Sequence, residues 1–412
     1  MPRRVIIVGG GAAGFFGAIT CAESAPKGTE IQILEKTSQF LSKVRISGGG
    51  RCNVTHACFE PRELSANYPR GEHELISPFQ KFSATDTIEW FEAHGVKLKT
   101  EADGRMFPTT DSSETIINCL LQAAKTLGIK LVLNCGVDKV EHKAEEGFIL
   151  SLQNGEKREC ERLLMATCGC RTPAAGAVAE SLGHSLISPV PSLFTFHIEC
   201  PLLREIPGVT VDSAEASVPG MGLKAKGPIL VTHWGLSGPA ILRLSAWAAR
   251  KLHATNYQFP LRINWLPQYG PEELLSTLTS HRIAHSARYL SNAPFPGVPA
   301  RLWEKLTVAA GLKAEARWSS LSKANLQALV QQLSQTEFQV IGKSLNKEEF
   351  VTCGGVSLKE VNFKTMESRV CPGLYFAGEL LDVDAITGGF NFQAAWTTGW
   401  LAGRAIANSL PK

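Results

Sequence analysis

A short apolar strand followed at once by a glycine-rich turn constrains this chain more than any other feature. Val5 to Val8 is a β-branched run, and the spacing Gly9-x-Gly11-x-x-Gly14 follows it directly. The first glycine permits a tight turn, the second lets the backbone approach a pyrophosphate, and the third lets the next helix pack closely on the strand. We expect that helix from Ala12 to about Cys21, with its N-terminus facing the phosphates of a dinucleotide.

A second strand is expected from Glu30 to Leu34, and it ends at an acid. Glu35 lies 21 residues after Gly14, where a carboxylate can accept hydrogen bonds from ribose hydroxyls. An acid at this position disfavours a ribose 2′-phosphate. The turn and the acid together predict a dinucleotide, although they do not separate FAD from NAD.

The matching half of the site lies near the other end of the chain. Gly373 to Glu379 reads as a strand leading into a Gly-Glu motif, and Thr387-Gly388-Gly389-Phe390-Asn391 follows. More than 350 residues separate this half from the first glycine turn. The chain therefore begins a nucleotide-binding fold, leaves it, and returns to complete it.

Another unusual stretch runs from Ser47 to Asn53 and contains three consecutive glycines. Without side chains, this backbone can lie close to a flat ring or a phosphate. Lys43 and Arg51 bracket the glycines with positive charge. The alternative interpretation is a flexible surface loop.

Several such motifs, in order along nearly the whole chain, make it similar to the HI0933-like flavoproteins, also known as the aminoacetone oxidase-like family. The motifs that carry the resemblance are Ser47 to Asn53, Asp103 to Pro108, Thr232 to Ala240, Gly354 to Val356, and the tail from Thr365 to Ala394. The resemblance implies noncovalent FAD in a discontinuous Rossmann-like α/β domain of the two-dinucleotide-binding-domain type, with an inserted β-barrel and helical subdomain.

The resemblance also assigns roles near the ring. Glu379 would bind the ribityl chain, and the helix that opens at the Gly-Gly-Phe-Asn segment would direct its N–H groups at the flavin N1–C2=O edge, where negative charge collects on reduction. The cofactor-binding residues expected from the motifs and the resemblance together are Gly9, Gly11, Ala13, Gly14, Glu35, Lys36, Lys43, Ser47, Gly48, Gly49, Gly50, Arg51, Cys52, Asn53, Val137, Thr167, Gly378, Glu379, Gly388, Gly389, Phe390 and Asn391.

One departure from the family pattern concerns a thiol. The family reads Ala-Thr-Gly-Gly after its central strand, whereas this chain reads Ala166-Thr167-Cys168-Gly169-Cys170. The simpler interpretation is a tolerated small side chain. A redox-active pair of Cys168 and Cys170 is the alternative, and it would require a strained bridge.

Composition changes divide the chain into segments. We expect residues 1–190 and 348–412 to form the FAD-binding domain and residues 191–347 to form the inserted domain. Within the insert, 191–266 and 336–347 read as β-structure, and 270–335 reads as helices. We see no internal repeat.

Two residues are candidates for catalysis. His233 lies in a loop shaped by glycines and a proline, and an imidazole can transfer protons near neutral pH. Arg105, in the Gly-Arg-x-Phe-Pro turn, has the charge to position an anionic substrate or a nicotinamide phosphate. The alternatives are a packing motif with a satisfied histidine and a structural salt bridge.

Charge and cysteine content bear on partners and location. The net charge is +4, and residues 191–347 contain 16 Lys and Arg against 9 Asp and Glu. This excess fits either an ordinary solvated surface or a surface for an anionic substrate such as RNA. The 11 cysteines lack a disulfide or zinc spacing, which suits a reducing cytoplasm. We expect no metal, no DNA and no membrane partner, and the sequence does not predict the oligomeric state.

These observations predict a cytoplasmic FAD-dependent oxidoreductase that transfers hydride through flavin N5, with NAD(P)H as a transient electron donor. Members of the resembling family imply three substrate classes: uridine in ribosomal RNA, small-molecule enones, and amines such as aminoacetone. The basic insert favours the RNA substrate, because phosphate contacts supply most sequence-independent affinity. A non-catalytic flavin-binding interaction protein is the distant alternative.

Overall fold

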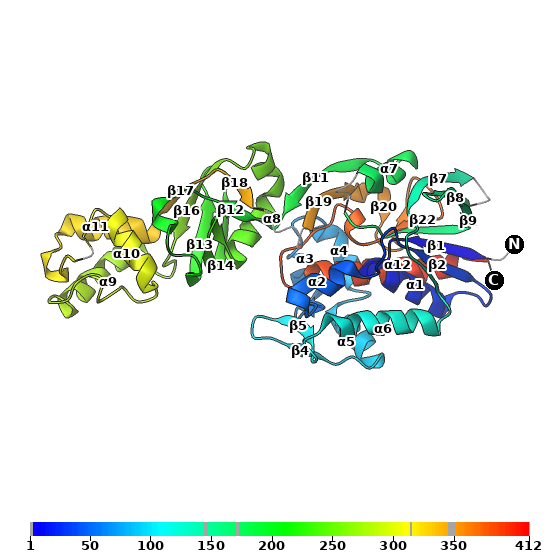
Figure 1. The fold of residues 1–412 in the computed structure, drawn as a ribbon, viewed down its shortest axis with the longest axis horizontal. Coiled ribbons are helices and arrows are strands. Elements are labelled where there is room, and N and C mark those ends of the chain that lie inside the picture. The colour runs from blue at the N-terminus through cyan, green and yellow to red at the C-terminus, as the bar shows by residue number, and fades with distance from the viewer. Residues whose placement is uncertain (1–2, 144–146, 170–172, 314, 345–350, 412) are drawn as a thin grey trace. The chain divides into compact units, whose positions relative to one another are not determined.

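The computed structural model describes residues 3–143, 147–169, 173–313, 315–344 and 351–411 (Figure 1). The chain divides into two compact units, one formed by Met1–Pro191 with Val351–Lys412 and the other by Ser192–Phe350. Among the described residues, no helix combines the length and the apolar character that crossing a membrane requires.

The first unit is built on a seven-stranded sheet with the order β20-β21-β22-β10-β1-β2-β6. The pairs from β22 to β6 are parallel, as in a Rossmann-like fold, whereas β20, β21 and β22 pair antiparallel at one edge. These strands are β1 (Arg4–Val8), β2 (Glu30–Leu34), β6 (Lys130–Val132), β10 (Arg162–Met165), β20 (Val361–Asn362), β21 (Glu367–Ser368) and β22 (Leu374–Phe376). The buried apolar residues of β1 explain why it lies in the middle of the sheet.

Two helices from opposite ends of the chain pack against each other in this unit: α1 (Ala12–Ser24) and α12 (Phe390–Ser409) (Figure 1). Glycines allow the close approach. A Cβ on Gly399 would lie 2.5 Å from the Ala13 carbonyl oxygen, and one on Gly403 would lie 2.4 Å from the Gly17 carbonyl oxygen. This contact joins the two halves of the nucleotide-binding fold that the sequence separates.

Shorter elements surround the sheet. The helices are α2 (Ser42–Gly50), α3 (Pro61–Ser65), α4 (Glu72–Phe79), α5 (Ala84–Ala93), α6 (Ser113–Thr126) and α7 (Pro173–Ser181), with single 3-10 turns η3 (Leu358–Glu360) and η4 (Gly378–Leu380). Two three-stranded sheets are formed by β3 (Thr55–His56), β5 (Arg105–Pro108) and β4 (Leu98–Thr100), and by β7 (Val137–Lys143), β8 (Gly147–Leu152) and β9 (Lys157–Cys160). A further pair joins β11 (Leu186–Ser192) to β19 (Val351–Val356).

The second unit contains a seven-stranded sheet with the order β17-β16-β13-β14-β15-β12-β18. Its strands are β12 (Thr195–His197), β13 (Thr210–Val218), β14 (Leu223–Thr232), β15 (Gly235–Ser237), β16 (Phe259–Asn264), β17 (Thr336–Val340) and β18 (Gly342–Ser344). The two strands at the ends of this order, β17 and β18, are consecutive in the chain with only Ile341 between them. The sheet therefore curls round in the manner of a barrel.

The helices of the second unit are α8 (Pro239–Ala254), α9 (Pro271–Ala284), α10 (Ala300–Ala309) and α11 (Lys323–Ser334), with 3-10 turns η1 (Pro201–Leu203) and η2 (Trp318–Ser320). One apolar core extends from the sheet into the helices. The indole N–H of buried Trp303 donates to the Leu290 carbonyl oxygen (2.8 Å), and that of Trp318 donates to Ala293 (3.1 Å).

The prediction of β-structure throughout 191–266 is wrong at α8. This helix begins with Pro239 at its first turn and buries Ile241, Leu244 and Leu252, which recur at helical spacing. The short strands on either side, with their glycine and proline punctuation, obscured that pattern.

Candidate functional site

The glycine turn after β1 has the geometry that a dinucleotide requires. A Cβ on Gly9 (φ +115°) would lie 2.4 Å from the Ala166 carbonyl oxygen, and a Cβ on Gly14 would lie 1.9 Å from the Gly9 carbonyl oxygen. These two glycines pack the turn against β10 and against itself. A Cβ on Gly11 would meet no protein atom within 4 Å, so this position faces open space at the start of α1. The three glycines thus divide their roles between packing and the approach of a ligand.

Glu35 is fixed at the end of β2. Its carboxylate accepts hydrogen bonds from the Gly10 N–H (2.9 Å), the Thr37 N–H (2.9 Å) and the Thr37 hydroxyl (2.8 Å). The Glu35 carbonyl oxygen accepts from the Cys135 N–H (2.8 Å), two residues before Val137, where β7 begins. The acid is therefore held beside the glycine turn, where a ribose can reach it.

Cys168 lies where several expected cofactor residues meet. The charges of Lys43, Glu379, Glu35 and Lys36 all act on its thiol. The side chain is exposed, yet the surrounding protein displaces enough water to raise the pKa of the thiol, while Lys43 opposes that shift. The thiol is therefore accessible and lies within the electrostatic reach of four expected cofactor residues. Cys170 falls outside the described residues, so a Cys168–Cys170 pair stays a hypothesis.

Thr167, the residue before Cys168, has an unsatisfied hydroxyl. Thr167 Oγ1 is buried and, within the described part of the chain, has no hydrogen-bond partner. Buried polar atoms without partners are uncommon and cost free energy. Together with the open space at Gly11 and the donors around Glu35, this orphaned hydroxyl fits a bound FAD, to which it could donate a hydrogen bond.

The Gly-Glu motif lies between α1 and the C-terminal helix α12. Gly378 adopts φ +71°, and a Cβ there would lie 2.9 Å from the Ala13 side chain. Its N–H donates to Thr398 Oγ1 (3.0 Å) on α12. The Glu379 carboxylate forms an ion pair with Lys43 of α2. Lys43 and Glu379, 336 residues apart, therefore form one polar pair between two segments that the sequence assigns to the cofactor.

The Ser47–Asn53 stretch is an ordered turn. Ser47 leaves the helical conformation of α2, and Gly48, Gly49 and Gly50 have φ values of +57°, +69° and +84°. A Cβ on Gly49 or Gly50 would meet no protein atom within 4 Å. The backbone of this turn is thus both strained for other residues and open to a ligand.

Cys52 and Asn53 continue this turn toward the start of α12. Cys52 is buried, which raises the pKa of its thiol to about 12, so only its backbone is suited to contact a ligand. With the Asn53 amide oriented to satisfy its neighbours, its oxygen accepts from the Gly389 N–H (2.9 Å) and its nitrogen donates to the Thr55 (3.0 Å) and Met106 (3.3 Å) carbonyl oxygens. Asn53 therefore joins three of the family motifs at one point.

The start of α12 is held by further contacts. Gly389 has φ +94°, and a Cβ there would lie 2.5 Å from the Thr55 carbonyl oxygen. The Asn391 side chain accepts from the Ala385 N–H (3.0 Å), and the Tyr68 hydroxyl donates to the Phe390 carbonyl oxygen. These contacts fix the helix N-terminus that the sequence assigns to the flavin ring.

His56 is a residue that the sequence analysis missed. Its Nδ1 lies 2.9 Å from the Gly388 carbonyl oxygen, and its ring stacks on Phe390 at 4.6 Å between centroids. On the other side, a Cβ on Gly104 would lie 2.5 Å from His56 Nε2. The signal in the sequence was its position three residues after Asn53, where the glycine-rich motif ends.

Arg105 and Arg51 share one carboxylate. Glu101 Oε2 lies 3.0 Å from Arg105 Nη2, and Glu101 Oε1 lies 2.6 Å from Arg51 Nη1. Arg105 also pairs with Asp103 (2.7 Å), and Arg51 lies over the ring of Phe107 at 4.0 Å. Arg105 thus has the structural salt bridge that was its alternative role, and a direct catalytic role stays a prediction.

His233 belongs to the other unit. It is exposed in the two-residue turn between β14 and β15, where Thr232 pairs with Gly235. The glycines of its motif pack tightly, since a Cβ on Gly235 would lie 2.3 Å from the Phe196 carbonyl oxygen and one on Gly238 would lie 2.8 Å from the Pro228 carbonyl oxygen. The motif therefore has a packing function, and a catalytic role for His233 stays a prediction.

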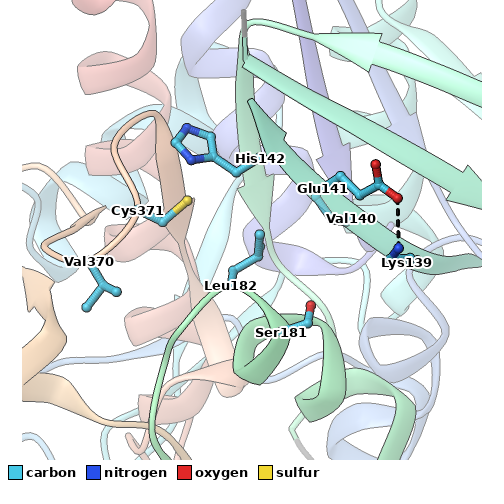
Figure 2. A pocket seen from close by; sticks show the side chains of 8 residues that line it. All are labelled: Lys139, Val140, Glu141, His142, Ser181, Leu182, Val370 and Cys371. Carbon is cyan, nitrogen blue, oxygen red and sulfur yellow. Dashed lines mark hydrogen bonds and ion pairs between the residues drawn. The ribbon is translucent and has the colours of Figure 1, made fainter. Parts of the chain in front are cut away.

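A cavity of about 400 Å³ lies elsewhere in the first unit, between β7, the end of α7 and the turn before β22 (Figure 2). None of the expected site residues lines it. Lys139 and Glu141 form an ion pair at its rim (2.8 Å), as Figure 2 shows. Its lining residues are Lys139, Val140, Glu141, His142, Ser181, Leu182, Val370 and Cys371.

Comparison with known proteins identifies the family. The description "HI0933-like protein Rossmann domain" matches residues 3–405. The chain belongs to the HI0933-like family. It is 32% identical over 405 residues to a ribosomal RNA dihydrouridine synthase of Escherichia coli, covering 96% of each chain, and 28% identical over 415 residues to a 3-dehydro-bile acid delta(4,6)-reductase of Clostridium scindens, covering 98% of this chain and 99% of that protein.

The fold also resembles solved structures. One is 3-ketosteroid delta1-dehydrogenase from Sterolibacterium denitrificans, with a TM-score of 0.55 and 13% identity, covering 98% of this chain and 99% of that one. The sequence-based identification of the family, of the Rossmann flavoprotein fold and of the class of FAD-dependent oxidoreductase is confirmed.

Proposed function

We propose that this FAD-dependent oxidoreductase reduces a carbon–carbon double bond conjugated to a carbonyl, and that its substrate is uridine in ribosomal RNA. The observation that carries the proposal is the similarity to the Escherichia coli ribosomal RNA dihydrouridine synthase over 96% of both chains. The C5=C6 bond of uracil is conjugated to a carbonyl and is a suitable hydride acceptor.

The residues of the first unit would hold FAD as follows. The Gly11 backbone and the start of α1 would hold the pyrophosphate, Glu35 would hold the ribose, and Glu379 with its partner Lys43 would hold the ribityl chain. When bound, FAD would supply two-electron transfer by hydride at N5. The start of α12 would contribute an N-terminal dipole that favours negative charge on the reduced ring.

His56 is our candidate for the proton that accompanies the hydride. It contacts Gly388 and Phe390, the segment that is expected at the ring. An imidazole nitrogen can donate or accept a proton at short range, so His56 has the chemistry for this role. In H56Q, uridine reduction should slow, while FAD stays bound and the rate of flavin reduction by the nucleotide donor stays unchanged. An unchanged rate of uridine reduction would remove His56 from the proton-transfer step.

NAD(P)H as the electron donor and the cytoplasm as the location are further parts of this proposal. The first test is anaerobic mixing of the yellow protein with NADPH and, in parallel, with NADH, while bleaching of the flavin absorbance is followed. The reduced protein is then mixed with a uridine-containing ribosomal RNA fragment, and dihydrouridine is measured by mass spectrometry of the digested RNA. The same fragment with every uridine replaced by cytidine is the control.

A second candidate is reduction of small-molecule enones, because the similarity to the Clostridium scindens reductase also spans the whole chain. Reoxidation of the reduced flavin by a steroid enone, but not by RNA, would favour this function. Flavin that neither nucleotide reduces, but that an amine reduces, would contradict both proposals and favour the amine oxidase.

A further inference from the structure

A cluster of basic and aromatic side chains lies at the end of α9 in the second unit. We call Arg282, His285, Arg288, Tyr289 and Arg317 the basic patch. The segment after α9 runs beside the segment before η2, because Tyr289 and Arg317 form an antiparallel bridge and the Trp318 N–H donates to the Arg288 carbonyl oxygen (3.1 Å). This pairing brings two cation-bearing segments, up to 35 residues apart in sequence, side by side.

Two of the patch arginines, Arg282 and Arg317, are held in place without being neutralised. Arg282 Nη1 donates to the Leu321 carbonyl oxygen (2.8 Å), and Arg317 Nη1 donates to the Ala287 carbonyl oxygen (2.5 Å). In the part of the chain that the structure describes, no carboxylate lies within 4.0 Å of Arg282, Arg288 or Arg317. Their positive charge is therefore available to a partner.

None of the described acids forms a direct ion pair with these arginines. Glu273 lies on the same helix, about 14 Å from Arg282 along the axis, which exceeds the Debye length at physiological salt. Glu315, two residues before Arg317, is exposed but forms no ion pair with the patch. Arg288 and Arg317 are themselves exposed, so a partner can reach them.

Tyr289 adds an aromatic face. It is 41% exposed, and the Arg317 guanidinium lies 4.9 Å from its ring centroid. The protein next to Tyr289 and Arg317 is tightly packed, because buried Trp318 stacks on Trp303 at 5.7 Å between centroids. Two exposed arginines in neighbouring segments, one of them held over an exposed ring, suit phosphodiester oxygens and an adjacent base, since guanidinium binds phosphate and the ring can stack on a base.

We propose that the basic patch binds the phosphodiester backbone of structured RNA and so holds the substrate on the second unit. This inference rests on the proposed ribosomal RNA substrate and names the surface that binds it. The expected contacts are Arg288 and Arg317 to phosphates and Tyr289 to a base.

The test is fluorescence anisotropy of a labelled ribosomal RNA hairpin bound to the FAD-loaded protein between 50 and 300 mM salt. R288Q/R317Q removes two charges from the patch. If each contacts one phosphate, the slope of log affinity against log salt becomes shallower by about 1.4 to 1.8, and affinity at 0.15 M salt falls about 20-fold. R288K/R317K should recover most of the slope.

K224Q/K226Q is the matched control, since it removes two charges from β14 of the same unit. Lys224 and Lys226 already lie 3.9 and 3.7 Å from Glu215, so their loss should leave RNA affinity within about twofold. Y289S should weaken RNA binding about tenfold without changing the salt slope, whereas Y289F should not. Flavin absorbance and the melting temperature confirm that each variant is folded.

An unchanged salt slope in folded R288Q/R317Q would overturn the proposal, and so would equal competition by polyglutamate of the same charge, which would indicate an acidic protein partner. Failure of the patch proposal can be distinguished from failure of the proposed uridine reduction. Wild-type protein that reduces no uridine, but whose RNA binding depends on the patch, contradicts only the function. Normal uridine reduction with patch-independent binding contradicts only the patch.

Discussion

Replacing Gly11 by alanine separates folding from cofactor binding. Gly11 has φ −93° and ψ −170°, which any residue adopts, and an added Cβ meets no protein atom within 4 Å. Gly11 is the N-cap of α1, where alanine is less favourable than glycine, but alanine also lowers the entropy of the unfolded chain. Because these effects oppose each other, the free energy of unfolding of the FAD-free protein should change by less than about 1 kcal/mol.

FAD binding should respond differently. If the pyrophosphate lies against this backbone, the new methyl group occupies space that the ligand needs, and overpacking of that kind costs about 1–3 kcal/mol. The dissociation constant for FAD should therefore rise about 5- to 150-fold in G11A. Titration of the FAD-free protein with FAD, followed by quenching of flavin fluorescence, measures this change, and chemical denaturation of the same protein measures its stability.

Gly270 provides the matched control. It is the N-cap of α9 in the second unit, with φ −70° and ψ 160°, and a Cβ there also meets no protein atom within 4 Å. G270A makes the same chemical change at a helix start with no expected cofactor contact. FAD affinity that is equal in wild type and G11A would refute the assignment of the pyrophosphate, and a loss of affinity in G270A would show that helix stability accounts for both effects.

Two further predictions concern single side chains. Maleimide should label Cys168 in the FAD-free protein, and bound FAD should slow that labelling at least tenfold, because the thiol lies among the expected cofactor residues. Mass spectrometry identifies the labelled residue, and equal labelling rates with and without FAD would contradict this placement of Cys168. Burial lowers the pKa of His184, whose Nε2 accepts from the Ser368 hydroxyl (2.8 Å). The folded state therefore binds this proton less readily than the unfolded state, and the stabilisation from neutral His184 is complete above pH 6.5 and is lost as pH falls toward the lowered pKa. Chemical denaturation between pH 5 and 7.5 should show that the free energies of unfolding of wild type and H184Q approach each other as pH falls. A constant difference between the two proteins across this range would contradict a contribution from neutral His184.

Local signals predicted much of the nucleotide-binding half. The strand at 30–34 has the observed bounds, and the helix that starts at Ala12 extends three residues beyond the predicted Cys21, to Ser24. Strand, turn and helix are adjacent in sequence, so their hydrophobic pattern and glycine spacing are sufficient to predict these elements. The helix α8 was missed because its apolar positions begin directly after a strand, with no loop to separate the two periods.

Local sequence signals did not predict the contacts between segments that are distant in sequence. His56 and Gly388 are 332 residues apart, and no spacing rule brings them together. The same holds for the glycines of α1 and α12, whose small size becomes meaningful only when the two helices are side by side. The family resemblance indicated which motifs belong to the cofactor, but it did not indicate that Asn53 connects three of them.

These long-range contacts explain why the site tolerates a discontinuous chain. The glycine turn and Glu35 are built from β1, β2 and the start of α1, whereas the flavin end is expected at α12 and the turn at Ser47–Asn53. The packing of α1 against α12 joins these two ends, because Gly378 lies too close to the Ala13 side chain to carry a Cβ and donates to Thr398. A bulky residue at Gly399 would therefore separate the two ends of the site as well as the helices, and FAD affinity should fall together with stability, in contrast to G11A.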